Sequence, residues 1–343
     1  MHSRRKHESR TFLSEIPPIS DIEQLAPQKR NWKQLYLRIF KAVIVVLVIV
    51  GIVYAGWKAV REFDRNEFDW RQVKPLWIVA SCLFYFAAMC SAWVYWQSLL
   101  LAMGQRPTVW QSVNAFFLGQ LGKYVPGKGM VVVIRAGLIK SHAVDASVAA
   151  LSVFVETLTM MAVGGFLAAA ILIFIAREQT GLVLLAVGLM FCAGVPTIPP
   201  LFRRVVRMLK VTRISDKVDA AIDRLTYGVI LKGWLISLVT WTMFGLSLYA
   251  VLKSLPGPQP EESDILLCIG CSALATVAGF LSLIPGGLGV RELVLLPLLG
   301  PEYGATKAAI AAVLLRFVWL VTELLVSFIL YLQQRFRAPR TED

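Results

Sequence analysis

Residues 119–128 read Gly-Gln-Leu-Gly-Lys-Tyr-Val-Pro-Gly-Lys, and residues 284–292 read Ile-Pro-Gly-Gly-Leu-Gly-Val-Arg-Glu. Each stretch interrupts a long apolar segment, at residues 109–139 and 265–299, because its glycine and proline residues cannot continue a regular helix. Charged side chains stand beside both interruptions, although the flanking sequence is apolar. The residues predicted to break the helices are Gly122, Pro126, Gly127, Pro285, Gly286, Gly287 and Gly289.

The composition is that of a protein embedded in a membrane. Of 343 residues, 57% are hydrophobic and 17% are charged, which excludes an ordinary soluble domain. The net charge of +13 comes from Lys and Arg residues that gather between apolar runs, so it indicates membrane orientation and not nucleic-acid binding. The five cysteines lie in apolar stretches and predict neither disulfides nor a metal site, and no cofactor is expected.

Six uninterrupted apolar segments are predicted to span the bilayer, in addition to the two broken ones. They lie at about residues 42–57, 76–103, 146–176, 182–201, 234–252 and 306–332. The predicted organisation is a cytoplasmic tail and juxtamembrane segment (1–40), a first span and outer loop (41–69), a first repeat (70–176), a linking span and basic cytoplasmic loop (177–232), a second repeat (233–333) and a cytoplasmic tail (334–343).

A weak internal repeat relates the two broken segments. At a fixed offset of 159 residues, Pro126-Gly127 aligns with Pro285-Gly286, and residues 146–151 align with residues 305–310. Chance is the alternative explanation, because alanine-rich spans align easily with one another. The shared order of span, broken segment and long span favours a true repeat.

The basic residues orient the two repeats. If each broken segment is a re-entrant hairpin, both tails and the basic stretch at residues 203–232 lie in the cytoplasm, as the positive-inside rule requires. If each segment crosses once, that stretch is exported, which the rule disfavours. We therefore predict an all-α integral membrane protein with six transmembrane helices and two oppositely facing re-entrant helical hairpins in an inverted repeat. We expect it in a bacterial cytoplasmic (inner) membrane, with both termini cytoplasmic.

The charges within the apolar segments predict a polar site. Irregular backbone at membrane depth is tolerated where it lines a cavity, and the free N–H groups of half-helix ends suit an anion such as a lipid phosphate. The candidate substrate-binding residues are Lys123, Lys128, Arg135, Arg291, Glu292 and Arg316. The candidate gating or coupling residues are Glu156 and Glu323.

Glu156 and Arg316 are predicted to meet. Each lies about ten residues into its span, which at 1.5 Å per residue is near the midplane. Their pair is expected either to hold the repeats together or to act in substrate binding and gating. For the three bases around the first break the alternative is snorkelling to the inner headgroups, and for Arg291 and Glu292 it is a pair at a helix start.

The two broken stretches, together with Arg135 and the span of Glu156, resemble the membrane domain of the lysylphosphatidylglycerol synthase family. The similarity runs over roughly residues 70–332. The resemblance implies a lipid flippase domain. Because the chain ends at Asp343, soon after the last span, we expect a stand-alone member without the aminoacyl-transferase domain, and not an enzyme.

Two other functions are left open. Lys-Tyr-Val-Pro-Gly at residues 123–127, followed by Arg135, also resembles the motif of DedA-type polyprenyl-phosphate translocases. An integral-membrane glycosyltransferase is less favoured, because the loops near Arg177 and Pro256 are short and lack paired carboxylates. We predict a transporter that moves a phospholipid, a glycolipid or a polyprenyl-phosphate-linked lipid between leaflets through a central cavity between the hairpins. Its expected partners are an anionic phosphate headgroup, the bilayer and a second copy of the chain, but no nucleic acid.

Overall fold

The computed structural model describes residues 70–124, 129–175, 188, 197–208, 216–282, 284–287 and 289–337. Within these ranges every regular element is a helix, apart from a single β-bridge between Ser141 and Val144. The prediction of an all-helical fold is therefore confirmed for this part of the chain. The predicted N-terminal tail, the span at residues 42–57, most of the span at 182–201 and residues 338–343 lie outside the described residues. Residues 334–337, predicted as tail, continue the last helix.

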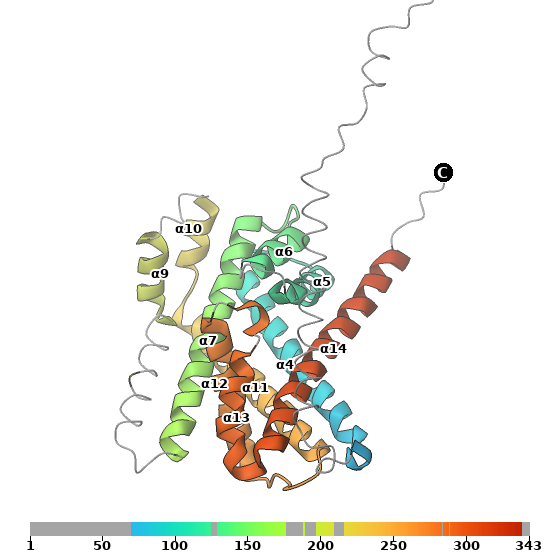
Figure 1. The fold of residues 1–343 in the computed structure, drawn as a ribbon. Helices are drawn as coiled ribbons and strands as arrows, with labels where there is room; N and C mark the ends of the chain where they lie inside the picture. The colour runs from blue at the N-terminus through green and yellow to red at the C-terminus, as the bar shows by residue number, and fades with distance from the viewer. Residues whose placement is uncertain are drawn as a thin grey trace, which may run out of the picture. The chain divides into compact units, whose positions relative to one another are not determined.

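Four long helices match four of the predicted spans (Figure 1). They are α4 (Pro75–Ala102), α7 (Ala146–Ile175), α11 (Tyr227–Ser254) and α14 (Ala305–Arg337). Among the described residues, five helices are long and apolar enough to cross a membrane, and the fifth is α12 (Asp264–Leu281) in the second broken segment. The chain is thus a multi-pass membrane protein, and the count of six spans stays a prediction.

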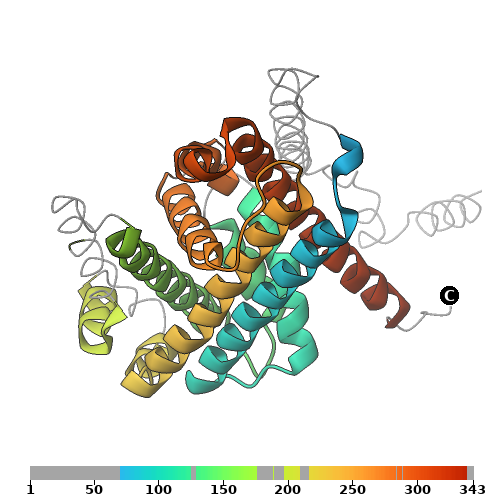
Figure 2. The ribbon, with the colours of Figure 1, turned by 90° about the horizontal axis from the view of Figure 1, so that it is seen from below.

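The helices α4 and α11 run antiparallel and lie side by side, as the view in Figure 2 shows. At one end, the N–H of Lys74 donates to the carbonyl of Ser254 at 2.9 Å, and further along the hydroxyl oxygens of Ser91 and Thr240 lie 2.7 Å apart. Small residues at such contacts let two helices approach closely. Because the two helices are antiparallel, the C-terminal end of α4 and the C-terminal end of α11 lie at opposite ends of the bundle.

The first broken segment leaves α4 and returns to α7 at the same end of the bundle. Arg106 precedes the segment and Ala143 follows it. The N–H of Arg106 donates to the carbonyl of Ala143 at 3.2 Å, which holds the two ends of the segment together. Thr108 caps the first of its helices by accepting a hydrogen bond from the N–H of Gln111 at 3.2 Å. The segment consists of α5 (Val109–Gln120), the 3₁₀ turn η2 (Leu121–Tyr124) and α6 (Met130–Ile139).

The second broken segment leaves α11 and returns to α14 at the opposite end. Near the start of α14, Lys307 donates to the carbonyl of Leu255, directly after α11, at 3.3 Å. At the same end, the hydroxyl of Tyr303 donates to the carboxylate of Asp264 at 2.6 Å, which joins the outer ends of the segment's two helices. The segment consists of α12 (Asp264–Leu281), the turn η5 (Pro285–Gly287) and α13 (Val290–Tyr303).

The stretch predicted as a basic loop also contains helices, α9 (Pro199–Met208) and α10 (Asp216–Asp223). Val218 and Ile222 of α10 are buried in a cluster that includes side chains of α4 and α7. Their spacing of four residues places both on one helix face, so a short amphipathic helix forms among the charged residues. α11 then begins at Tyr227, earlier than the predicted 234.

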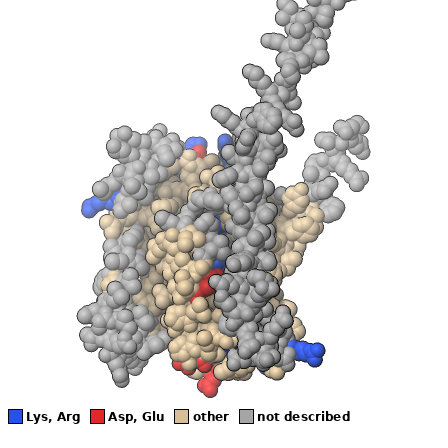
Figure 3. Space-filling model, in the orientation of Figure 1, with Lys and Arg blue, Asp and Glu red and all other residues tan. Residues whose placement is uncertain are grey.

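On the face drawn in Figure 3, uncharged side chains cover most of the described surface. Charged side chains gather mainly toward the two ends of the helices, and an acidic group is visible about midway along them. This distribution fits a surface in contact with lipid, where charges are costly except at the interfaces or beside a partner.

Candidate functional site

The two breaks meet in the structure, where η2 contacts η5. At the first, a Cβ added to Gly122 would lie 2.8 Å from the backbone nitrogen of Val131, so a larger residue does not fit without a backbone shift. At the second, Gly286, Gly287 and Gly289 have φ angles of 60°, 66° and 80°, which glycine adopts most readily. The predicted break residues Pro126 and Gly127, and the predicted ligand Lys128, lie outside the described residues.

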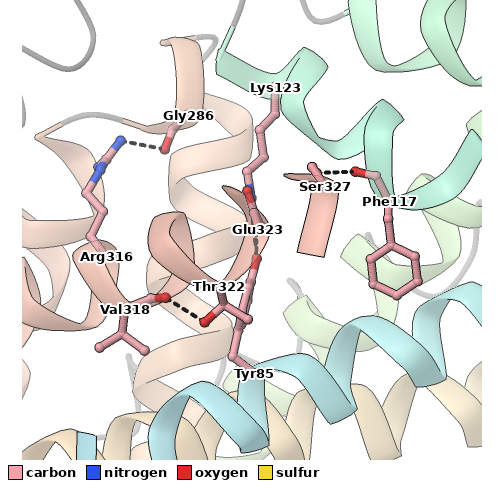
Figure 4. A network of polar contacts seen from close by, with 9 residues as sticks. All are labelled: Tyr85, Phe117, Lys123, Gly286, Arg316, Val318, Thr322, Glu323 and Ser327. Atoms are coloured by element: carbon pink, nitrogen blue, oxygen red, sulfur yellow. Dashed lines mark hydrogen bonds and ion pairs between the residues drawn. The ribbon is translucent and has the colours of Figure 1, made fainter. Parts of the chain in front are cut away.

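Lys123, in the first break, reaches Glu323 on α14 (Figure 4). The carboxylate of Glu323 has no exposed surface and accepts hydrogen bonds from the ammonium of Lys123 and the hydroxyl of Tyr85 on α4. The Lys123 nitrogen and the Tyr85 oxygen lie 3.4 Å apart. Lys123 and Glu323 were each predicted as candidate residues, but their pairing was not predicted, because the residues are 200 positions apart.

A second buried ion pair lies within the first repeat. Arg135 on α6 and Glu156 on α7 are 2% and 3% exposed, and Arg135 Nη1 donates to Glu156 Oε2 at 2.6 Å. The guanidinium carbon lies 4.0 Å from the ring centroid of Phe116 and 5.3 Å from that of Trp96. The pair is therefore enclosed by aromatic side chains, which fix the cation through packing and cation–π contact.

A third pair lies at the corresponding place in the second repeat. Arg316 on α14 donates through Nη1 to Glu292 on α13 at 2.9 Å, and through Nη2 to the carbonyl of Gly286 at 3.1 Å (Figure 4 draws the second bond). The side chains of Arg316 and Glu292 keep 12% and 21% of their surface exposed. Glu292 lies in the first turn of α13, where a negative charge is favourable.

The predicted contact between Glu156 and Arg316 is wrong. Each residue instead pairs with the second helix of its own broken segment, Glu156 with Arg135 and Arg316 with Glu292. The two residues were predicted to meet because they lie at similar depth along the membrane normal, but depth does not decide which neighbouring helix a side chain faces. At the offset of 159 residues, the two pairs correspond to within two positions, with acid and base exchanged.

A cavity opens beside the third pair, between α12, α13 and α14. It is small, and its polar lining includes Arg291, Glu292, Arg316 and Thr276. Arg291 makes no ion pair among the residues that the structure describes, and its guanidinium carbon lies 5.6 Å from the ring centroid of Trp319. Of the buried side-chain atoms without a hydrogen-bond partner in the described residues, Arg291 Nε, Arg316 Nε and Glu292 Oε2 belong to this lining, whereas Arg135 Nε and Glu323 Oε2 belong to the other two pairs.

A family model described as the lysylphosphatidylglycerol synthase TM region matches residues 39–327. The chain belongs to this family. No curated protein matches the chain. The match covers both broken segments and all three ion pairs, so the features above belong to the family's membrane domain, and the resemblance seen in the sequence is confirmed.

Within this lysylphosphatidylglycerol synthase TM domain, the cavity differs from the enclosed Arg135–Glu156 pair in its balance of charge. One carboxylate, Glu292, faces two guanidinium groups, Arg291 and Arg316, so the lining has an excess of one positive charge. Buried polar atoms generally have partners, and the unpartnered donors beside the cavity, Arg291 Nε and Arg316 Nε, are groups that water, an ion or a ligand can complete. The arrangement suits an anionic group that accepts hydrogen bonds from both arginines.

Proposed function

We propose that the chain is a lipid transporter of the flippase type, which moves a lipid with an anionic phosphate headgroup between the two leaflets. The observation that carries the proposal is the cavity lined by Arg291 and Arg316 in a membrane-embedded bundle. Membership of the lysylphosphatidylglycerol synthase TM family supports a role connected with membrane lipids. We propose transport without an enzymatic step, in a bacterial cytoplasmic membrane.

In this proposal, the two broken segments are re-entrant hairpins that enter the bilayer from opposite sides. Their attachment at opposite ends of the antiparallel α4–α11 pair and the contact between η2 and η5 support such an inverted repeat. Six full spans with both termini in the cytoplasm complete the topology. The two breaks then meet within the hydrocarbon region of the bilayer. They provide polar groups there, whereas the lipid chains provide none.

The chemistry of the cavity favours a phosphate over a neutral headgroup. The planar guanidinium groups of Arg291 and Arg316 recognise phosphate oxygens in preferred two-bond geometries. The unpartnered oxygen of Glu292 can accept a hydrogen bond from a hydroxyl or amino group beyond the phosphate. A phospholipid, a glycolipid phosphate and a polyprenyl phosphate all carry the required anion.

Lipid translocation in proteoliposomes tests the proposal. Fluorescent phosphatidylglycerol, a neutral diacylglycerol analogue and a polyprenyl phosphate are compared as substrates of the full chain. We expect faster translocation of the anionic lipids than of the neutral one. Arg291→Gln should slow it by about tenfold to a hundredfold, which corresponds to one charge-assisted hydrogen bond.

The matched control is Arg106→Gln, which removes the same charge from an exposed position outside the cavity. This variant should translocate lipid at the wild-type rate. Equal rates for empty liposomes and wild-type proteoliposomes with every lipid would contradict the transport proposal. Wild-type transport by Arg291→Gln would instead contradict the assignment of the headgroup to this cavity.

A further inference from the structure

Arg291 carries a charge at the cavity that is not paired with a carboxylate. It makes no ion pair among the residues that the structure describes, and its buried Nε has no hydrogen-bond partner there. The acids of α13 and α14 in this region already contact other bases, because Glu292 pairs with Arg316 and Glu323 pairs with Lys123. A cation inside a membrane protein is costly without a partner. Some other group must therefore hold the Arg291 guanidinium at the cavity.

The group that lies against Arg291 is the indole of Trp319 on α14. The guanidinium carbon lies 5.6 Å from the ring centroid, within the range of a cation–π contact, and Trp319 lines the same cavity. The face of an aromatic ring carries partial negative charge, and tryptophan binds cations best among the aromatic residues. The ring attracts the guanidinium without neutralising it, so the charge of Arg291 stays available to an anion.

The indole of Trp319 is itself fixed by α4 and α11. Its N–H donates to the hydroxyl oxygen of Ser247 at 3.0 Å, and that oxygen lies 2.8 Å from the hydroxyl oxygen of Ser81. The Tyr85 ring stacks on the indole with centroids 4.7 Å apart, and the Phe244 ring lies 5.0 Å away. Only 6% of Trp319 is exposed. A hydrogen bond and two neighbouring rings therefore keep the indole in one orientation beside the cavity.

The stem of Arg291 lies close to Gly279 on α12. A Cβ added to Gly279 would lie 2.9 Å from Cγ of Arg291 and 3.0 Å from its Nε, so a larger residue would displace the arginine side chain. The place of the guanidinium is therefore set by two features, the missing side chain on α12 and the indole on α14.

We propose that Trp319 is a positioning residue of the headgroup site, whose indole holds the guanidinium of Arg291 in place of a carboxylate and keeps its charge available to a phosphate oxygen. This role rests on the proposed function, since the anion is the headgroup assigned to the cavity. The first repeat shows the contrast. There Arg135 has aromatic neighbours and also the carboxylate of Glu156, so that pair carries no net charge.

Nuclear magnetic resonance of arginine Nε–H groups tests the contact without any ligand. The full chain is labelled with isotopic arginine in detergent, and the Arg291 signal is identified by its loss in Arg291→Gln. Because the ring current of an indole shifts the signals of nearby protons, the Arg291 signal should move in Trp319→Leu. It should stay closer to its wild-type position in Trp319→Phe, which keeps an aromatic face.

Lipid binding tests the consequence of the contact. Native mass spectrometry of the full chain, titrated with phosphatidylglycerol or with neutral diacylglycerol, gives an apparent dissociation constant for each. Trp319→Leu should weaken binding of phosphatidylglycerol by about tenfold and leave binding of diacylglycerol unchanged. Trp319→Phe should restore most of the affinity. Gly279→Ala should weaken binding of phosphatidylglycerol as well, although it keeps the indole and every charge, so the test does not depend on the folding of Trp319→Leu.

Trp241→Leu is the matched control for the loss of a buried indole. Trp241 on α11 has no exposed surface, and its N–H donates to the carbonyl of Met160 at 3.0 Å. Its ring also contacts Phe244, with centroids 5.4 Å apart, but no cation lies over it in the described part of the chain. This variant should keep the wild-type Arg291 signal and the wild-type affinity for phosphatidylglycerol.

A double-mutant cycle separates positioning from a general structural effect. In the Arg291→Gln background, Trp319→Leu should cause little further loss of phosphatidylglycerol binding, because the group that it positions is gone. An equal loss in both backgrounds overturns the proposal, and so does an Arg291 signal that is unchanged in Trp319→Leu. If that signal moves as expected but the wild type binds both lipids equally, the positioning contact stands and only the headgroup assignment fails.

Discussion

The two repeats place an ion pair at the same position but surround it differently. In the first, Arg135 and Glu156 are enclosed by aromatic rings, and their exposed fractions are 2% and 3%. In the second, Glu292 and Arg316 line a cavity beside Arg291, which has no ion-pair partner in the described part of the chain. The comparison shows that the same architecture can seal an ion pair among aromatic rings or leave it beside a cavity, and we propose that the first arrangement serves stability and the second serves binding.

Breaking the enclosed pair should have the largest effect. Arg135→Gln leaves the carboxylate of Glu156 buried without its cation, so we expect the free energy of unfolding in detergent to fall by about 3–5 kcal/mol. The double variant Arg135→Met/Glu156→Leu should recover much of this loss, because no charge is left unpaired. Thermal or denaturant unfolding of the wild type, Arg135→Met, Glu156→Leu and the double variant measures the cycle. Losses that merely add would show that the two side chains are not coupled in the folded protein.

The glycines of the first break test how closely its two halves pack. Gly122→Ala places a Cβ 2.8 Å from a backbone nitrogen, so we expect a loss of about 1–3 kcal/mol in stability from overpacking. Gly129→Ala, seven residues later in the same segment, meets no atom within 4 Å and serves as the control. Unfolding of both variants is compared under one condition. Equal stability of the two would mean that η2 does not pack as closely as described.

Breaking the Glu292–Arg316 pair beside the cavity should lower the free energy of unfolding less than breaking the enclosed pair does, and it should change lipid transport more. Glu292→Gln removes a partner from a pair that retains exposed surface, so we expect a stability loss of only about 1 kcal/mol. Transport of anionic lipid should change, because the variant frees Arg316 and alters the charge of the cavity. Parallel unfolding and translocation assays separate the two effects. A stability loss as large as that of Arg135→Gln would remove the distinction between the repeats.

The start of α7 gives the smallest predicted effect. Asp145 Oδ1 accepts from the N–H groups of Ser147 and Val148 at 2.9 and 3.3 Å. Partial burial raises the pKa of Asp145, but these bonds and the ammonium of Lys217 outweigh it, so the pKa lies below its ordinary value. Asp145→Ala should therefore cost about 0.5–1 kcal/mol near neutral pH.

The lowered pKa of Asp145 determines how its contribution to stability depends on pH. A carboxylate whose pKa is lowered by folding contributes stability above its unfolded pKa of about 3.9, and the contribution is lost as pH falls through the folded value. The difference between wild type and Asp145→Ala should therefore shrink in acid. Unfolding measured at neutral and acidic pH checks this. A difference that grows on acidification would contradict the capping role.

The sequence predicted the long helices and the two breaks because hydrophobic length and Gly/Pro chemistry are local properties. Residues near 76–103, 146–176 and 306–332 form helices with closely similar bounds. The helix α10 was missed because its apolar spacing lies among charged residues over only eight positions. The sequence signal for it was the spacing of Val218 and Ile222, which lie four residues apart and therefore on one face of a helix, where both are buried.

The candidate residues were found more readily than their partners. Charges in apolar segments are costly, so Glu156, Arg316 and Glu323 stood out without a structure. The pairing of these residues depends on how each helix is rotated about its axis and packed against its neighbours. The similar depth of Glu156 and Arg316 carries no information about that rotation. The charge-reversed match of the two repeats was the available signal, since each pair joins residues only 21 and 24 positions apart.

The most direct test of the central claim is native mass spectrometry of lipids retained by the purified full chain. The account predicts that the wild-type protein retains an anionic phosphate-bearing lipid, and that Arg291→Gln loses most of it while Arg106→Gln retains it. Because Arg291 has no ion-pair partner among the described residues, its loss should remove lipid without unfolding the protein. Retention of the same anionic lipid by Arg291→Gln at the wild-type level would contradict the assignment of the headgroup site to the second repeat.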